Sequence, residues 1–184
     1  MQKTSDKYKT PDKYKTLSSE LIYDGRVISL YKDGVKIGDV CAQREYVRHS
    51  GGAAVLAEKD GKFAFVSQYR HPFGKEILEI PAGKREKNEP PEITAKRELS
   101  EECGLKAENL KQIASFCVSP GYSDEIIWVY YADNFIEGTI HLDADEVLET
   151  VWIEKEKAFK MIESGEIFDG KTVVALLWYM ANKR

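Results

Sequence analysis

Four charged residues between positions 97 and 102 are spaced so that they could bind a metal ion together. On a helix, Glu98 and Glu102 are four residues apart and therefore lie one above the other on one face. Glu101 borders that face, and Arg97 lies four residues before it and can pair with its carboxylate. Clustered carboxylates repel one another, and a bound cation would offset this cost. Hard oxygen ligands of this kind are typical of Mg²⁺ sites in phosphoryl chemistry.

The residues around the acidic cluster decide its interpretation, because such a cluster alone is more often a solvated helix face. Gly83 is followed after five residues by Glu89, and after seven more by Arg97-Glu98-Leu99. The pattern then closes with Glu101-Glu102 and, one residue later, Gly104-Leu105. Average residue usage would supply this combination in roughly one in ten million chains of this length. A chance match is therefore excluded, and the cluster is part of a motif.

This motif resembles the Nudix box, and the chain resembles the Nudix hydrolase family over nearly the whole of the part expected to be ordered. The resemblance implies the α+β class and an α/β/α sandwich, here with a small N-terminal antiparallel β unit. It also implies an enzyme that hydrolyses a nucleoside diphosphate linked to another moiety, by attack of water on the pyrophosphate. The expected cofactor is Mg²⁺, with Mn²⁺ as a substitute.

The resemblance also assigns roles to single residues of the box. Arg97 orients the acidic cluster, Gly83 permits a tight loop, and Glu89 supports that loop without a catalytic role. We count Arg97 and Glu101 among the catalytic residues. The expected metal ligands are Glu98, Glu101, Glu102 and the backbone carbonyl of Ala82.

Three features outside the box resemble the ADP-ribose pyrophosphatase branch of the family. Pro120 follows Gly104 by sixteen residues, residues 79–83 resemble the entry into the box, and residues 44–47 end an N-terminal β unit. In that branch the small domain forms a homodimer and helps to bind adenosine in the partner subunit. The resemblance implies hydrolysis of ADP-ribose to AMP and ribose 5-phosphate. The alternatives are a GDP- or UDP-hexose as substrate, or a sensor that binds ADP-ribose without cleaving it.

The same resemblance indicates where the substrate binds. It places Arg70 beside the phosphates, where a guanidinium group is well suited, and Arg44 near the adenine or its ribose. Both arginines could instead be ordinary surface residues. The sequence Ser119-Pro120-Gly121 is also common in turns that bind no substrate. Adenine could stack on one of three tyrosines, namely Tyr23, Tyr31 and Tyr46. The expected substrate-binding residues are Arg44, Arg70, Glu79, Gly83, Ser119, Pro120, Gly121 and Glu125.

A general base is expected from the acidic loop at residues 141–149, before a late strand. We choose Glu146, with Asp145 and Glu149 as alternatives. A carboxylate that closes on bound substrate suits general-base catalysis. A solvated acidic loop is the competing interpretation.

Secondary-structure signals indicate the elements that position these residues. A helix is predicted from Pro91 to Cys103, with Gly104 at its C-terminal end. Two C-terminal helices follow, and in the second the apolar Val174, Leu177, Trp178 and Ala181 share one face. Asp33-Gly34 and Asp60-Gly61 are turn signals. Strands are expected at 21–23, 27–31, 35–37, 41–47, 53–56, 62–69, 77–80, 113–118, 126–131 and 147–153.

Composition sets the broad class of protein. The chain of 184 residues carries a net charge of −4 and has no dense basic patch, which argues against nucleic acid as a partner. No apolar run approaches the roughly 20 residues that span a bilayer, so no membrane partner is expected. Three widely spaced cysteines suggest free thiols in the cytoplasm. We expect a flexible tail at residues 1–16, the β unit at 17–48 and the catalytic domain at 49–184.

Overall fold

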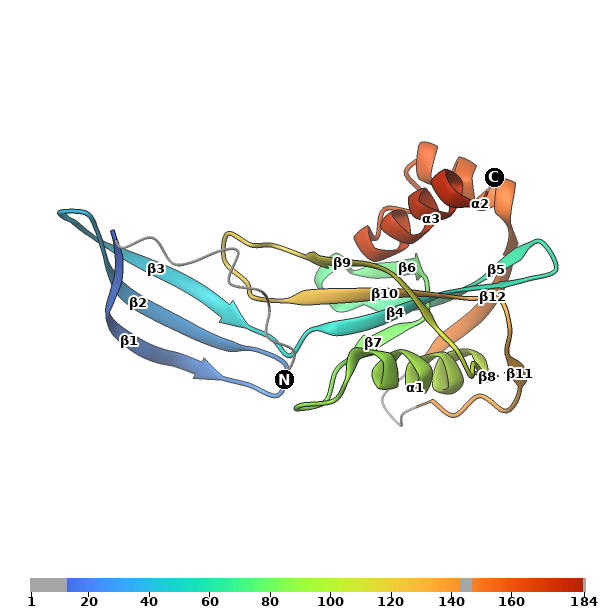
Figure 1. The fold of residues 1–184 in the computed structure, drawn as a ribbon, viewed down its shortest axis with the longest axis horizontal. Coiled ribbons are helices and arrows are strands. Elements are labelled where there is room, and N and C mark those ends of the chain that lie inside the picture. Colours follow the sequence, from blue (N-terminus) through green and yellow to red (C-terminus); the bar gives the residue numbers. More distant parts are fainter. Residues whose placement is uncertain (1–12, 143–146, 184) are drawn as a thin grey trace. The chain divides into compact units, whose positions relative to one another are not determined.

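The computed structural model describes residues 13–142 and 147–183, which form two compact units (Figure 1). The first unit runs to His49 and also takes in Ser119–Asp124, and the second holds the remainder of the chain. The flexible tail was expected to extend to Thr16, but Tyr14–Thr16 already belong to a strand. Residues 1–12 of that tail lie outside the described residues.

The first unit is a three-stranded antiparallel sheet of β1 (Tyr14–Asp24), β2 (Ser29–Ile37) and β3 (Val40–Arg48). The predicted turn at Asp33-Gly34 is wrong, because both residues pair inside β2 with β1 and β3. The chain reverses instead at Gly38, whose φ of +61° is a left-handed conformation that favours glycine. Residues 119–124 join this sheet through Val47, which donates to the carbonyl of Tyr122 over 2.7 Å.

The second unit is built on a mixed seven-stranded sheet with the path β12-β5-β4-β10-β9. β6 pairs with β5 and β7 pairs with β4, while β8 and β11 form a separate two-stranded sheet. The predicted turn at Asp60-Gly61 joins β4 to β5, with φ of +50° and +78°. The strands are β4 (Gly52–Lys59), β5 (Lys62–Arg70), β6 (Lys75–Glu79), β7 (Ala82–Lys84), β8 (Leu105–Lys106), β9 (Lys111–Cys117), β10 (Ile126–Ala132), β11 (Ile136–Glu137) and β12 (Leu148–Glu154).

The helices match the predicted positions in the chain. α1 (Pro91–Cys103) has the predicted bounds and ends at Gly104, which adopts φ of +66°. α2 (Lys155–Glu163) and α3 (Gly170–Asn182) follow β12, and a short 3₁₀ helix, η1 (His71–Phe73), follows β5. Only part of the expected apolar face of α3 packs, because Trp178 lies against the core whereas Leu177 is half exposed. The buried face carries Thr172, Ala175, Leu176 and Tyr179.

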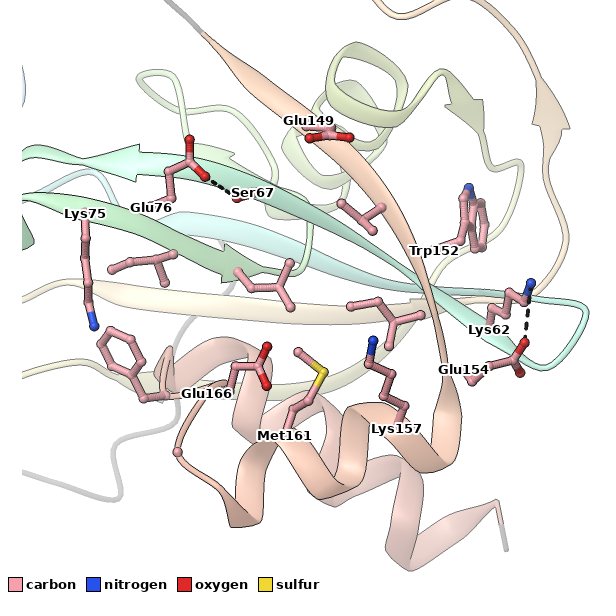
Figure 2. A pocket seen from close by; sticks show the side chains of 16 residues that line it. Lys62, Ser67, Lys75, Glu76, Glu149, Trp152, Glu154, Lys157, Met161 and Glu166 are labelled. Carbon is pink, nitrogen blue, oxygen red and sulfur yellow. Dashed lines mark hydrogen bonds and ion pairs between the residues drawn. The ribbon is translucent and has the colours of Figure 1, made fainter.

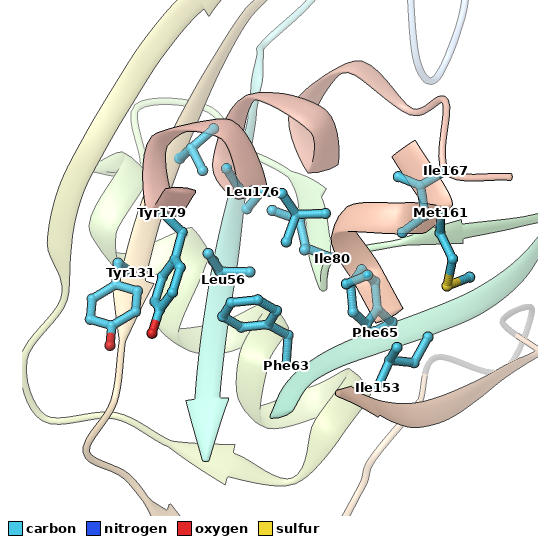
Figure 3. Packing of buried hydrophobic residues seen from close by; sticks show 14 residues of the cluster. Leu56, Phe63, Phe65, Ile80, Tyr131, Ile153, Met161, Ile167, Leu176 and Tyr179 are labelled. Atoms are coloured by element: carbon cyan, nitrogen blue, oxygen red, sulfur yellow. The ribbon is translucent and has the colours of Figure 1, made fainter. Parts of the chain in front are cut away.

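Helices cover both faces of the main sheet, which confirms the α/β/α sandwich (Figure 1). β4 is buried on both sides, so its alternate residues enter two different cores. Ala54 and Leu56 face the core under α2 and α3, together with Phe63, Phe65 and Ile80 (Figure 3). Ala53 and Val55 face the core beneath α1. No helix among the described residues is long and apolar enough to cross a membrane.

Candidate active site

The Nudix-like motif folds as a loop that enters α1, with its two predicted principal ligands on the buried side of the helix. Glu98 is 6% exposed and Glu102 is 2% exposed, although both are carboxylates. Ala95 and Leu99 are four residues apart and are fully buried in the core under α1. A Cβ at Gly83 would lie 2.0 Å from the Glu98 carboxyl group, so only glycine leaves room for that carboxylate. Sequence reasoning assigned Gly83 to a tight loop, and the structure adds this close approach.

Arg97 joins the carboxylates of this motif. Its Nη1 donates to Glu98 over 2.6 Å and to Glu101 over 3.0 Å, which confirms the predicted pair with Glu101. Its Nη2 lies 3.4 Å from the Glu89 carboxylate. Burial alone would lower the pKa of Arg97, but the negative charge around it outweighs burial and raises that pKa. Arg97 therefore stays charged and holds three carboxylates by hydrogen bonds.

Glu89 supports the loop as the sequence predicted. Its Oε2 accepts hydrogen bonds from the Glu86 amide and the Thr94 hydroxyl, over 3.1 and 2.7 Å. Burial raises the pKa of Glu89, yet these bonds and Arg97 together hold it below its usual range. The carboxylate is therefore ionised and stabilises the turn into α1.

Arg85 is a second support of this loop that sequence reasoning missed. Its Nε and Nη2 donate to the carbonyl of Glu89 over 3.1 and 2.6 Å, and its Nη1 donates to the carbonyl of Ser50 over 3.2 Å. The guanidinium group also lies over the Trp128 ring, 4.5 Å from its centroid. Arg85 thereby fastens the loop to the start of β4. No signal in the sequence could have revealed this, because Ser50 and Trp128 come from distant segments.

The donor set of this cluster fits a hard divalent cation. One arginine faces three carboxylates, so the cluster keeps net negative charge. Glu102 is fixed by the amide of Ala82, which donates to its Oε2 over 2.8 Å. Within residues 13–142 and 147–183, no three His, Cys, Asp or Glu side chains already gather around a common point. The carboxylates are instead arranged around Arg97, and their oxygens are the ligands that Mg²⁺ and Mn²⁺ prefer.

A pocket of about 330 Å³, here called the Arg70 pocket, lies in the same unit. Three of the expected substrate-binding residues line it, Arg70, Glu79 and Glu125. Glu79 is 3% exposed and receives a two-pronged contact from Arg70, with Nε at 2.6 Å and Nη2 at 2.8 Å. The other lining residues are Phe73, Ile77, Phe116, Val118, Ile127, Phe168, Asp169, Gly170 and Lys171.

Lys171 from the start of α3 also pairs with Glu79, and it lies 3.1 Å from Asp169. Asp169 caps α3 by accepting hydrogen bonds from the amide and hydroxyl of Thr172. Burial would raise the pKa of Glu79, but Arg70 and Lys171 outweigh it and hold that pKa below its usual value. An Asp before an apolar helix is a sequence signal for an N-cap, so the role of Asp169 could have been predicted. The contact of Lys171 with Glu79 has no such signal in the sequence.

A larger pocket of about 740 Å³ lies between β6, β12 and α2 (Figure 2). Glu149, an alternative to Glu146 as the base, lines this pocket near Ser67 and Glu76. None of the carboxylates of the α1 cluster lines it. Thr150, the residue after Glu149, instead donates from its hydroxyl to the carbonyl of Glu102 over 2.7 Å. Adjacent residues of a strand point to opposite faces, so Glu149 points away from α1.

The remaining predicted residues fall elsewhere. Arg44, Ser119, Pro120 and Gly121 belong to the first unit, where Ser119 accepts bonds from Tyr122 and Ser123 in a tight turn. Two stacking candidates, Tyr31 and Tyr46, lie against each other with centroids 5.4 Å apart, and Arg48 lies over both. Glu146 and Asp145 lie outside the described residues.

Comparisons with known proteins agree with this geometry. The model of the NUDIX domain matches residues 47–176. The chain is 45% identical over 165 residues to "ADP-ribose pyrophosphatase" of Bacillus subtilis (strain 168), covering 88% of this chain and 89% of that protein. The chain therefore belongs to the Nudix family.

Two further comparisons add a differently named relative and a fold. The chain is 42% identical to "Methanol dehydrogenase activator" of Bacillus methanolicus, over 88% of this chain and 89% of that protein. A solved structure described as "Crystal structure of ADP compounds hydrolase" matches with a TM-score of 0.80 at 18% identity, covering 95% of this chain and 96% of that chain. At this identity the structural match supports the fold.

Proposed function

We propose that this protein hydrolyses the pyrophosphate of ADP-ribose to AMP and ribose 5-phosphate. The observation that carries the proposal is the pair of buried carboxylates on one helix, Glu98 and Glu102. Arg97 holds Glu98 and the neighbouring Glu101, and the Ala82 amide holds Glu102. Support for the substrate comes from two relatives named ADP-ribose pyrophosphatase, at 45% and 35% identity. The Arg70 pocket supplies a place for a phosphorylated group in the same unit.

The residues that would hold Mg²⁺ are Glu98, Glu101 and Glu102, with the carbonyl of Ala82. When bound, the ion supplies Lewis-acid polarisation of phosphate oxygens. Arg97 holds Glu98 and Glu101 in place, and the Ala82 amide fixes one oxygen of Glu102. Arg70, oriented by Glu79, presents a guanidinium group that suits a phosphate.

The carboxylates of the α1 cluster are engaged by Arg97 and the Ala82 amide, so we assign the proton of the attacking water to a base outside this cluster. We keep Glu146 for this role, in a segment outside the described residues. Glu149 is a poorer candidate for the base, because it lines the larger pocket and its strand neighbour Thr150 faces α1. A Glu146→Gln variant that keeps normal turnover at neutral pH would remove Glu146 from the mechanism.

The decisive experiment is a substrate panel with Mg²⁺, containing ADP-ribose, GDP-mannose, UDP-glucose, NADH and diadenosine polyphosphates. We expect ADP-ribose to have the highest kcat/KM, by about tenfold or more, with AMP and ribose 5-phosphate as products. Mn²⁺ is expected to substitute for Mg²⁺. If another sugar nucleotide leads the panel, the reaction type stands and the substrate assignment fails. Binding of ADP-ribose without turnover would instead identify a sensor.

A second candidate function comes from the relative named as an activator of methanol dehydrogenase. Its similarity covers as much of the chain as that of the ADP-ribose pyrophosphatase. The test is to add the protein, and its Glu102→Gln variant, to a methanol dehydrogenase assay. Activation by the wild type alone would tie this role to the same hydrolytic site.

We further propose that the protein is a cytoplasmic homodimer formed through the first unit. Support comes from the apolar side chains that β1 and β3 leave exposed, including Leu17, Tyr23 and Val40, each more than half exposed. Sedimentation equilibrium at micromolar concentration is expected to give twice the chain mass. A monomer at that concentration would remove this proposal and the shared adenosine site with it.

A further inference from the structure

We propose that Lys171 is a specificity-determining residue, and that the Arg70 pocket binds the sugar phosphate half of the substrate. This inference rests on the proposed function and goes further by assigning one half of ADP-ribose to one pocket. It also gives Glu79 a different role from substrate binding. In this role Glu79 is a positioning residue that anchors the two cations, Arg70 and Lys171.

The contacts of Glu79 carry the first step. Both of its carboxylate oxygens are engaged, one by Nε of Arg70 and the other by Nη2 of Arg70 and by Lys171. Because those contacts use one edge of the guanidinium group, the Nη1 edge of Arg70 remains available for a ligand. Lys171 is 11% exposed and is fixed a second time by Asp169. Both cations line the pocket, so its polar end presents two oriented donors.

The aromatic walls carry the second step, because they do not form a slot for a base. Phe73 and Phe168 meet edge to face at 5.9 Å, and Lys75 lies over the Phe168 ring at 4.4 Å from its centroid. A base sandwich needs parallel ring faces, and these two rings are not parallel. Arg70 and Lys171 suit a phosphate, and the carboxylates of Glu125 and Asp169 can accept hydrogen bonds from sugar hydroxyls. The rings can contact the carbon face of a sugar.

The size of the pocket carries the third step. At about 330 Å³ it is at the small end of the range for pockets that enclose a drug-sized ligand. It therefore suits one half of ADP-ribose rather than the whole molecule.

The Arg70 pocket is also joined to the α1 cluster. Ala82, whose amide holds Glu102, is three residues after Glu79. β6 ends at Glu79 and β7 begins at Ala82, so these two contacts lie at adjoining strand ends. A pyrophosphate between Glu102 and Arg70 would thus place its distal group in the pocket.

The test is calorimetric binding of ribose 5-phosphate and of AMP to wild type and to Lys171→Met. Lys155→Met is the matched control, because Lys155 also pairs with a carboxylate, that of Glu58. Lys155 does not line the Arg70 pocket and is not part of the α1 cluster. We expect Lys171→Met to weaken ribose 5-phosphate binding by about tenfold or more, since a charged hydrogen bond is lost. AMP binding is expected to stay within about twofold. Lys171→Arg is expected to restore most of the affinity.

Three outcomes would overturn the inference. If AMP binding falls instead, the pocket takes the nucleoside half. If neither ligand is affected while both lysine variants lose stability alike, Lys171 is a structural residue only. Should Lys171→Met fail to fold, Phe168→Ala tests the same pocket, and unchanged ribose 5-phosphate binding would contradict the assignment. Since binding is measured without turnover, an inactive wild type would sink the proposed function and leave this test standing.

Discussion

The second unit contains two charge clusters in which the signs of the central and the surrounding groups are opposite. Around α1, one cation, Arg97, holds three carboxylates. In the Arg70 pocket, one buried carboxylate, Glu79, holds two cations. The first arrangement gathers carboxylate oxygens, which suits a metal ion, and the second orients hydrogen-bond donors, which suits a phosphate. In both clusters one central charged residue fixes several groups of the opposite sign, and only Glu79 of the two central residues is buried. Variants of the α1 cluster should therefore mainly affect turnover, and variants at Glu79 should also affect stability.

The largest effect on turnover is expected from Glu102→Gln. The variant keeps an oxygen that can accept from the Ala82 amide, so the fold is expected to persist. It loses the negative charge needed by a hard cation, and several kcal/mol of transition-state stabilisation correspond to about a thousandfold in kcat. Steady-state kinetics across a Mg²⁺ titration, with a thermal melt of the same sample, measures both quantities. Near-normal turnover by folded Glu102→Gln would contradict the metal assignment.

Gly83→Ala separates turnover from stability within the same cluster. The new Cβ would meet the Glu98 carboxyl group at 2.0 Å, and the end of that flexible side chain must move away. Misplacing a group at the chemical centre by about 1 Å can cost on the order of a hundredfold in rate. We expect turnover to fall by that order while the melting temperature changes little. Gly121→Ala, where an added Cβ meets nothing within 4 Å, is the steric control for stability.

Glu79→Gln is the matching test of the other cluster. Removing the shared partner leaves Arg70 and Lys171 close together in a mostly buried place, which should cost about 3 kcal/mol of folding stability. Chemical denaturation of variant and wild type at pH 7 measures this difference. A loss of turnover with unchanged stability would show that Glu79 acts on the substrate directly.

The pH dependence of the same variant sharpens the comparison. The pKa of Glu79 in the folded protein is below its usual value, so its contribution is complete above the unfolded pKa of about 4.3. That contribution is lost as the pH falls through the folded pKa. The stability gap between wild type and Glu79→Gln should therefore narrow below about pH 4. A gap that stays constant down to pH 3 would show that the Glu79 charge contributes nothing.

The sequence predicted the α1 cluster far better than the pocket, for a physical reason. Glu98, Glu101 and Arg97 lie within one helical turn, so the spacing of 3.6 residues fixes their contacts. Glu79 and Lys171 are 92 residues apart, and only the packing of α3 on the sheet brings them together. The missed turn at Gly38 and the misjudged face of α3 have the same origin. In both cases strand pairing or burial against distant segments outweighed the local sequence preference.

Thr150→Val should have the smallest effect, and it probes how β12 supports the α1 cluster. The Thr150 hydroxyl donates to the carbonyl of Glu102, one of the last carbonyls of α1 without an acceptor role inside the helix. Valine keeps the shape of the side chain and leaves that carbonyl without this donor, at about 1 kcal/mol. We expect a small fall in melting temperature and a higher Mg²⁺ concentration for half-maximal activity, with Thr150→Ser restoring both. If only the melting temperature moves, β12 stabilises α1 without positioning Glu102.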